Sequence, residues 1–295
     1  ALSADTKGSY AVAVGHATLA AQNFTTATSS YNTAVGYSAG RYVTTGVQNT
    51  LVGALAGDAL IDADANVAVG YLALSADTYG SKAVAIGQQA LAAQNNTTAT
   101  DSHNVAIGYQ TGLTVTTGGG NVLVGALVGD AMTVGNSNVA IGHNALTTEV
   151  AGDRTTAIGF QALALQTNAT TTDVYNVAVG YNTGYSMTSG VQNSLLGSMA
   201  GLALTTGDNN VALGYKSLYT EDTGNRSVAI GDYALYTQNN DDSNYNIAVG
   251  YNAGKAVTTG VQNTIVGGIA GDALTDADLN TVVGYNALAA DTLGS

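Results

Sequence analysis

The chain has 295 residues, of which 20 are acidic and 7 basic, so its net charge is −13. This charge argues against nucleic acid and anionic membranes as partners, because both bind positively charged surfaces. The absence of Cys excludes disulfides and thiolate chemistry. Hydrophobic residues make up 45% of the chain and recur in register, which excludes disorder, and no apolar run reaches the roughly 18 residues of a membrane span.

A nine-residue pattern, seen as NTAVGYSAG at residues 32–40, recurs along the whole chain. Each copy is centred on a glycine that follows Val, Ile or Leu. In chain order these repeat glycines are Gly15, Gly36, Gly53, Gly70, Gly87, Gly108, Gly125, Gly142, Gly159, Gly180, Gly197, Gly214, Gly231, Gly250, Gly267 and Gly284. Their spacings of 21, 17, 17 and 17 residues recur, with 19 replacing 21 in the last cycle, so four turns form a superrepeat of 72 residues.

Short fixed periods of this kind indicate stacked supersecondary units. We therefore predict an all-β fold, a parallel β-solenoid or β-roll of about sixteen stacked turns, with strands of about 4 to 6 residues and essentially no helix. Residues 1–295 are expected to form a single repetitive rod about 75 Å long, at about 4.8 Å per turn.

The residues before each repeat glycine predict a strand with two apolar faces. The residue preceding the glycine and the residue two positions earlier point to one side, and the residue between them points to the other. That middle residue is Ala in eleven turns and larger in five, at Leu51, Leu123, Leu195, Ile265 and Val282. We expect the alanine face to be the outer one, covered closely by identical chains in a threefold bundle.

Asn stands four residues before the repeat glycine in twelve of the sixteen turns. The candidate ladder positions include Asn32, Asn49, Asn66, Asn104, Asn121, Asn138, Asn176 and Asn193. A ladder of stacked amides and a turn-forming role are equally good interpretations. Four residues after the glycine, the chain reads Leu, Gly, Gly, Leu in each superrepeat, and we expect a positive φ at these glycines and a packed side chain at the leucines.

Tyr follows the repeat glycine in seven turns, at Tyr37, Tyr71, Tyr109, Tyr181, Tyr215, Tyr251 and Tyr285. An aromatic column that stiffens the stack is the favoured interpretation, and a platform for stacking sugars is the alternative.

No constellation of residues predicts catalysis. The three histidines, His16, His103 and His143, do not recur as a set. Acidic runs occur at Asp58, Asp62 and Asp64 and again at Asp272, Asp276 and Asp278. Oxygen-rich loops can bind calcium, but the two middle superrepeats lack these carboxylates, so a solvated bend is favoured. We predict no catalytic residue, cofactor site or metal site, and the chain is not expected to be an enzyme.

The first spacing of each superrepeat is longer and predicts a loop that bulges from the rod about every 19 Å. These loops and one further segment carry the glycosylation sequons of Asn23, Asn95, Asn96, Asn168 and Asn225. Such sequons arise often by chance in a chain rich in Asn and Thr. The hypothesis is that the loops carry glycans or contact a host or a neighbouring fibre.

The segments SKAVAIGQQALAAQNN, NVAVGYLAL and NTAVGYSAG resemble the head repeats of trimeric autotransporter adhesins, whose motif reads N-S-V-A-I-G-x-x-A. They are also similar to the NTAVGYxAL-type repeats of phage tail-fibre and related surface-fibre proteins. The resemblance covers the whole chain and implies a left-handed parallel β-roll in which three chains associate into a rod.

The two ends of the sequence match, since ALSADTKGS at residues 1–9 resembles ALAADTLGS at residues 287–295. We expect a window of a longer repeat array or a subunit that stacks end to end. The leading interpretation is a structural protein that forms the shaft of an extracellular, cell-surface or virion fibre. The alternatives are an adhesin that binds a host surface protein or glycan and an ice-binding solenoid.

Overall fold

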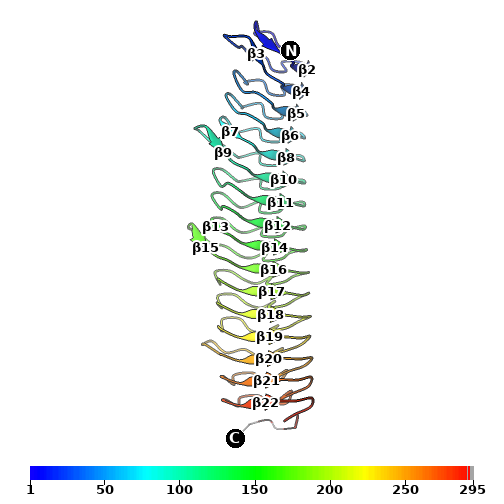
Figure 1. Ribbon diagram of the computed structural model, residues 1–295, viewed down its shortest axis with the longest axis vertical. Helices are drawn as coiled ribbons and strands as arrows, with labels where there is room; N and C mark the ends of the chain where they lie inside the picture. The colour runs from blue at the N-terminus through cyan, green and yellow to red at the C-terminus, as the bar shows by residue number, and fades with distance from the viewer. Residues whose placement is uncertain (291, 293–295) are drawn as a thin grey trace. The chain divides into compact units, whose positions relative to one another are not determined.

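The computed structural model describes residues 1–290 and 292, and the chain divides into two compact units, Ala1–His143 and Asn144–Ser295. The described residues form parallel strands joined by turns and contain no helix, which confirms the predicted β-solenoid (Figure 1). No helix suited to crossing a membrane therefore occurs in this part of the chain. The matching segment at residues 287–295 lies partly outside the described residues.

In the first unit, each of the eight turns contributes one strand to a parallel sheet. These strands are β2 (Val12–Val14), β4 (Thr33–Val35), β5 (Thr50–Val52), β6 (Val67–Val69), β8 (Val84–Ile86), β10 (Val105–Ile107), β11 (Val122–Val124) and β12 (Val139–Ile141). Each residue pairs with its equivalent in the next turn, as Ala34 does with Leu51. Short pairs lie beside this sheet, β1 (Gly8–Ser9) with β3 (Thr28–Ser29) and β7 (Gly80–Ser81) with β9 (Thr100–Asp101).

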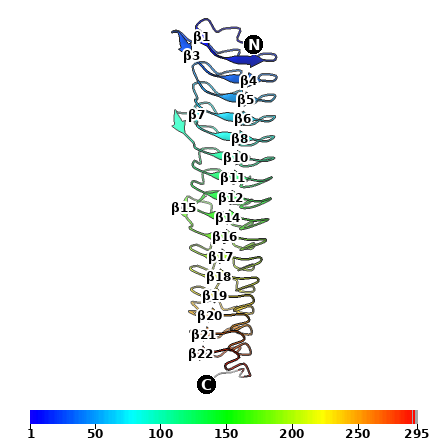
Figure 2. The same cartoon turned by 45° about the vertical axis from the view of Figure 1, so that its right-hand side comes forward.

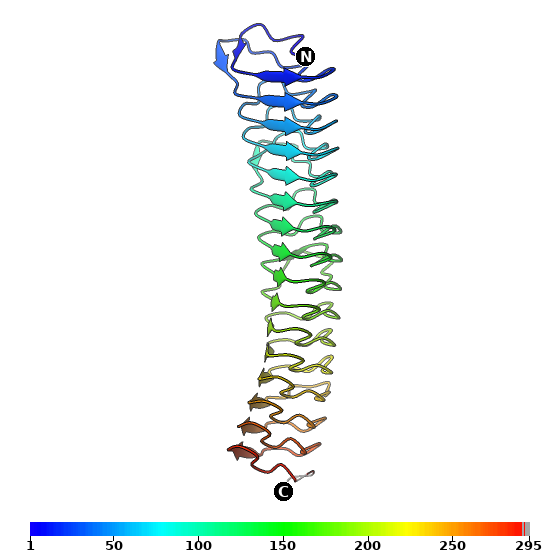
Figure 3. The same cartoon turned by 90° about the vertical axis from the view of Figure 1, so that its right-hand side faces the viewer.

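The second unit repeats this arrangement with eight further turns. Its sheet comprises β14 (Thr156–Ile158), β16 (Val177–Val179), β17 (Ser194–Leu196), β18 (Val211–Leu213), β19 (Val228–Ile230), β20 (Ile247–Val249), β21 (Thr264–Val266) and β22 (Thr281–Val283). A short pair forms between β13 (Gly152–Asp153) and β15 (Thr172–Asp173). Figure 3 shows the strands of each unit following one another in a column.

The strands are shorter than predicted, because left-handed residues close them at both ends. Each sheet strand has three residues, where 4 to 6 were expected. In the turn of β4, for example, Tyr31 has a φ of 49° before the strand and Gly36 a φ of 139° after it. Extended backbone cannot continue through such residues, so most of each 17-residue turn is bend.

The prediction that the alanine face of the strands lies outside was wrong. The middle residue, usually Ala, is buried in every described sheet strand except β2, as at Ala34, Ala106 and Ala178. The flanking Val, Ile, Leu and Thr residues lie on the outside. Their exposed apolar members define the outer strand face: Val12, Val14, Val35, Ile107, Val177, Leu196, Leu213, Ile247, Val266 and Val283. The small residues are inside because a turn of 17 residues encloses a narrow core.

The alternation of Leu and Gly after the repeat glycine fills this narrow core evenly. Leu19 and Gly40 both have a positive φ, 45° and 57°, so the expectation that only the glycines would be left-handed was wrong. A Cβ on Gly40 would lie 2.7 Å from a methyl of Leu51 and 2.9 Å from one of Leu19. Burial of a leucine contributes about 1.5–3 kcal/mol, which offsets the cost of about 1–2 kcal/mol for its left-handed backbone.

Candidate functional site

The irregular part of each superrepeat is an expanded loop in its long spacing. The expanded loops are residues 23–31, 95–103, 167–175 and 239–245. In the first three, a two-residue strand pairs with the preceding turn, and Figure 2 shows β7 and β15 beside the stacked strands of their units. In the last loop, a single bridge joins Ser243 to Asn225.

A buried carboxylate lies beneath the expanded loop at residues 167–175. Glu149 is fully buried, and its Oε1 accepts hydrogen bonds from the backbone N–H groups of Val150, Ala151 and Gly152 at 2.9, 3.1 and 2.7 Å. The backbone N–H of Asn168 donates to the same oxygen at 3.0 Å. Three successive backbone N–H groups that point at one oxygen form an anion-binding nest.

Side-chain amides complete the surroundings of the Glu149 carboxylate. Gln166 Nε2 and Asn168 Nδ2 donate to Oε2 at 2.8 and 2.9 Å. All these donors are neutral, so the contacts that the described residues make with the carboxylate are N–H dipoles. A cation is not required to hold a carboxylate that accepts this many hydrogen bonds.

The same site recurs every 72 residues. Asp77 and Glu221 are fully buried beneath the loops at residues 95–103 and 239–245, and Asp5 is half-buried at the corresponding place in the first superrepeat. The sequence analysis did not identify these carboxylates. A signal existed in the residue ten positions before the repeat glycine. It is acidic in the first turn of each superrepeat, Thr or Asn in the second turn, and aliphatic or Met in the third and fourth turns, as at Leu60.

Each carboxylate begins a directional chain of amides. In the second superrepeat, Gln94 Nε2 donates to Asp77 at 2.6 Å, and Asn104 Nδ2 donates to Gln94 Oε1 at 2.9 Å. Asn121 then donates to Asn104 Oδ1 from both its backbone N–H and its Nδ2, at 2.9 and 3.2 Å. The backbone N–H of Asn138 donates to Asn121 Oδ1 at 2.9 Å. Every donor in the series points toward the buried anion.

The asparagines also satisfy the backbone of the bends. Asn104 Nδ2 donates to the carbonyl of Gly118 and Asn121 Nδ2 to that of Gly135, at 2.7 and 2.8 Å. Equivalent donations from Nδ2 to a carbonyl of the next turn are made by Asn32, Asn49, Asn66, Asn176 and Asn193. None of these residues has a positive φ, since the left-handed residue is the one before each of them. A side chain of this length with both a donor and an acceptor explains the choice of Asn at these positions.

The first turns of the superrepeats lack this Asn for a reason that the structure supplies. Small residues stand there, and the Gln of the following turn occupies the space beside them. Gln166 Nε2 donates to Thr155 Oγ1 at 3.2 Å, and Gln238 Nε2 donates to Ser227 Oγ at 2.7 Å.

The net pKa shifts of two of the carboxyl groups are opposite in direction. Desolvation raises the pKa of Glu221 above its ordinary value, against the hydrogen bonds donated by Gln238 and Gly224. At Asp5, desolvation also acts to raise the pKa, but the hydrogen bonds from Gln22 and the backbone N–H groups together lower it. The difference arises because Asp5 is only half-buried, so its desolvation is weaker.

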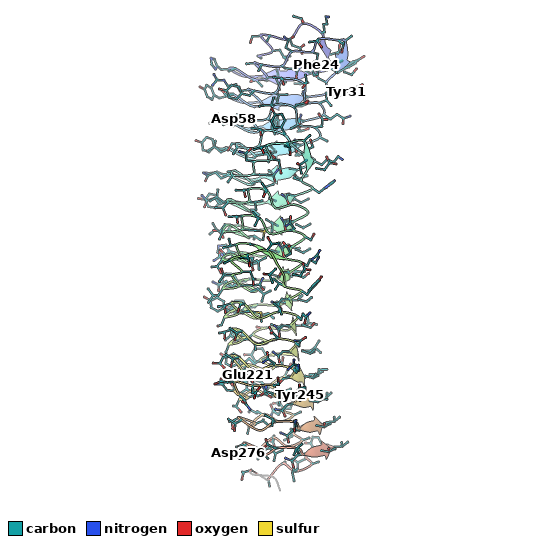
Figure 4. All side chains as sticks on the ribbon, turned by 90° about the vertical axis from the view of Figure 1, so that its left-hand side faces the viewer. Phe24, Tyr31, Asp58, Glu221, Tyr245 and Asp276 are labelled. Atoms are coloured by element: carbon teal, nitrogen blue, oxygen red, sulfur yellow. The ribbon has the colours of Figure 1, made fainter. Side chains whose placement is uncertain are left out.

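The raised pKa of Glu221 predicts a dependence of stability on pH. The folded state binds more protons than the unfolded state between the ordinary pKa of 4.5 and the higher folded value. The free energy of unfolding therefore rises as the pH falls through this window. Relative to Glu221→Gln, the wild type should gain stability as the pH is lowered from 7 to 4 in urea titrations. Asp276→Asn, at an exposed carboxyl group (Figure 4), controls for the loss of one charge. The prediction would be contradicted if the free energy of unfolding of the wild type, relative to that of Glu221→Gln, decreased toward pH 4.

The candidate glycosylation residues differ in their accessibility. Asn23 and Asn95 are exposed, and Asn225 is half-buried. Asn96 and Asn168 are buried, and their backbone N–H groups donate to Asp77 and Glu149. A sugar attached at either position would have to displace these buried contacts in the folded chain.

The predicted tyrosine column is interrupted. Tyr37, Tyr71, Tyr109, Tyr181, Tyr215, Tyr251 and Tyr285 are exposed, and turns with other residues lie between them. Parallel ring stacking involves neighbours of other types, as His16 with Tyr37 and Phe160 with Tyr181, both at 5.4 Å between centroids.

The acidic runs stabilise bends within the stack. Asp64 Oδ1 accepts a hydrogen bond from the backbone N–H of Val47 at 2.8 Å, and Asp278 Oδ1 accepts one from Val261 at 2.7 Å. Asp62 accepts a hydrogen bond from Thr45 Oγ1 at 2.7 Å. Across residues 1–290 and 292, no group of three His, Cys, Asp or Glu side chains is arranged to hold a metal ion.

Three stretches of the sequence match a known family, the YadA head domain repeat. The matched residues are 79–100, 139–162 and 151–183. This confirms the predicted resemblance to the head repeats of trimeric autotransporter adhesins, which are cell-surface proteins. Residues 79–100 and 151–183 each include a strand together with all or part of an expanded loop. Neither the curated proteins nor the solved structures gave a significant match to the chain.

Proposed function

We propose that this chain is a structural protein that forms the shaft of an extracellular fibre, in which three copies lie side by side with their outer strand faces together. The observation that carries the proposal is the apolar character of that face. Leu196 and Leu213, on neighbouring strands, are 46% and 40% exposed, and Val177 and Ile247 are 43% and 40% exposed. Covering the exposed part of each such side chain stabilises an assembly by about 1 kcal/mol.

Two further features support a structural role. The repeat places Val, Ile or Leu at the last strand position of each described turn, so one chain offers a similar surface many times to a parallel copy. The buried amide chains bind each turn to the next through side chains as well as backbone. The match to a repeat of cell-surface adhesins supports an extracellular location and self-association.

Analytical ultracentrifugation tests the arrangement. The wild type should sediment with a mass three times that of the 29.4 kDa chain. The double variant Leu196→Glu, Leu213→Glu should sediment as a monomer, because it places two charges on the outer strand face. Leu165→Glu is the matched control, since Leu165 is 39% exposed and lies outside the strands. Circular dichroism checks that the variants remain folded.

A monomeric wild type, or a double variant that remains trimeric, would exclude this interface. If the double variant fails to fold, Leu196→Asn and Leu213→Asn test the same face without introducing charge repulsion between the two positions.

A second candidate function is adhesion, in which the same fibre binds a surface glycan or protein. Adhesion is favoured by the matched family of adhesins. It is also favoured by a group of Tyr and Lys side chains on the surface of the second unit that depart from the repeat pattern.

A further inference from the structure

One surface cluster in the second unit is not explained by the repeat. It consists of Tyr215, Lys216, Tyr219, Tyr233, Tyr236 and Lys255, which we call the Tyr–Lys cluster. These residues come from three successive turns, at the bends that follow β18, β19 and β20. The turn before them has Ser198, Met199 and Leu202 at the corresponding positions. The fold therefore does not require four tyrosines and two lysines here.

The rings form one connected surface. Tyr215 packs edge-to-face on Tyr233, with centroids 5.4 Å apart and an interplanar angle of 89°. Tyr233 contacts Tyr236 at 5.5 Å, and Tyr236 stacks on Tyr219 at 5.1 Å. Packed against one another, the four rings have little freedom to lose when a ligand binds.

The two lysines lie over these rings. Lys216 Nζ is 5.4 Å from the centroid of Tyr215 and 5.0 Å from that of Tyr219, and Lys255 Nζ is 5.6 Å from that of Tyr233. An ammonium group held over a ring keeps N–H donors on its other side. Within the described residues, neither lysine has a carboxylate at ion-pair distance, whereas Lys82 pairs with Asp101.

The cluster thus offers hydrogen-bond donors and two positive charges on a chain with a net charge of −13. One carboxylate lies beside it, that of Asp232, whose Oδ1 accepts a hydrogen bond from the backbone N–H of Tyr215 at 2.8 Å. Four phenol groups and two ammonium groups are suited to a ligand with hydroxyls and an anionic group. Nucleic acid fits poorly, because it requires a longer positively charged track than two lysines provide. We propose that the Tyr–Lys cluster binds a carboxylated sugar, with the carboxylate on the lysines and the hydroxyls on the phenols.

This proposal deepens the adhesive role and rests on it. It is independent of lateral association, so its failure leaves the shaft role to be decided by ultracentrifugation. The test is a calorimetric and saturation-transfer NMR titration of the assembled protein with 3′-sialyllactose, with trigalacturonate and with neutral lactose. Both acidic sugars should bind at least about tenfold more tightly than lactose, since a charge-assisted contact contributes about 1.5–3 kcal/mol, or more than tenfold in affinity.

Variants locate the site. Lys216→Gln with Lys255→Gln should weaken binding of the acidic sugars about tenfold or more, and Tyr233→Leu should weaken it as well. Lys82→Gln and Tyr71→Leu, which lie outside the cluster, should leave it unchanged. Absent binding, equal affinity for lactose, or full binding by the double lysine variant would overturn the proposal. A double lysine variant that loses self-association and not sugar binding would show instead that the cluster contacts another copy of the chain.

Discussion

Replacing the repeat glycine Gly108 with Ala is expected to destabilise the first unit by about 4 kcal/mol or more. Gly108 has a φ of 140°, a region that L-residues rarely adopt. A Cβ on it would lie 2.2 Å from the carbonyl oxygen of Gly125 in the next turn and 2.7 Å from Thr111 Oγ1. Backbone atoms cannot move away without separating β10 from β11, so backbone strain and lost hydrogen bonds add to one another.

Gly268→Ala is the matched control for this substitution. Gly268 directly follows a repeat glycine, and a Cβ there would meet only the Tyr285 ring at an ordinary 3.5 Å. That variant should be neutral or slightly stabilising, because Ala restricts the unfolded chain. Urea unfolding followed by circular dichroism measures both changes. A loss below about 1 kcal/mol in Gly108→Ala would mean that the turns can separate locally at little cost.

Replacing Glu149 with Ala should have an effect of similar size, at least about 4 kcal/mol. The carboxylate accepts hydrogen bonds from Val150, Ala151, Gly152, Gln166 and Asn168. Each donor left buried without an acceptor costs about 1–3 kcal/mol, and water entering the cavity recovers only part of this. The variant should release the expanded loop at residues 167–175 before the rest of the unit unfolds.

Hydrogen exchange by mass spectrometry distinguishes a local from a global effect. Glu149→Ala should speed exchange at Gly152 and Asn168 far more than in β17 and β18. Glu149→Gln, which keeps the size of the side chain but replaces one acceptor oxygen with a donor, should show an intermediate loss. Unchanged exchange in the loop would contradict the anchoring role of the carboxylate. Asp276→Ala, at an exposed carboxyl group, should alter neither region.

The size of the expected effect of each substitution on stability depends on whether the residue joins two turns of the solenoid. Each turn contacts only its neighbours, so damage at one turn is not compensated by distant contacts. A residue that joins two turns through backbone geometry, such as Gly108, therefore has a large effect. A residue on the outer strand face, such as Leu196, should change association and leave the stability of a single chain nearly unchanged.

The period, the glycine column and the number of turns could be predicted from the sequence alone. The reason is that every turn repeats the same local requirement, and Gly108 and its equivalents meet it in the same way. The sequence also indicated the asparagine positions, because twelve turns share them. The strands were predicted to be longer than they are. The sequence pattern does not reveal the left-handed residue before each Asn, because this residue is Tyr31 in one turn and Gln48 in the next.

Which strand face lies inside, and what the irregular residues do, became clear from the folded stack. Alternation along a strand separates Ala34 from Val35 but does not say which of them faces the core, since that depends on how the turn closes. Glu149 and Gln166 are 17 residues apart and meet only because the turns stack. The Tyr–Lys cluster likewise joins three turns into one surface, and its residues have no shared pattern in the sequence. Contacts that every turn repeats can be predicted from one turn, whereas contacts made once per superrepeat or once in the chain depend on which turns are neighbours.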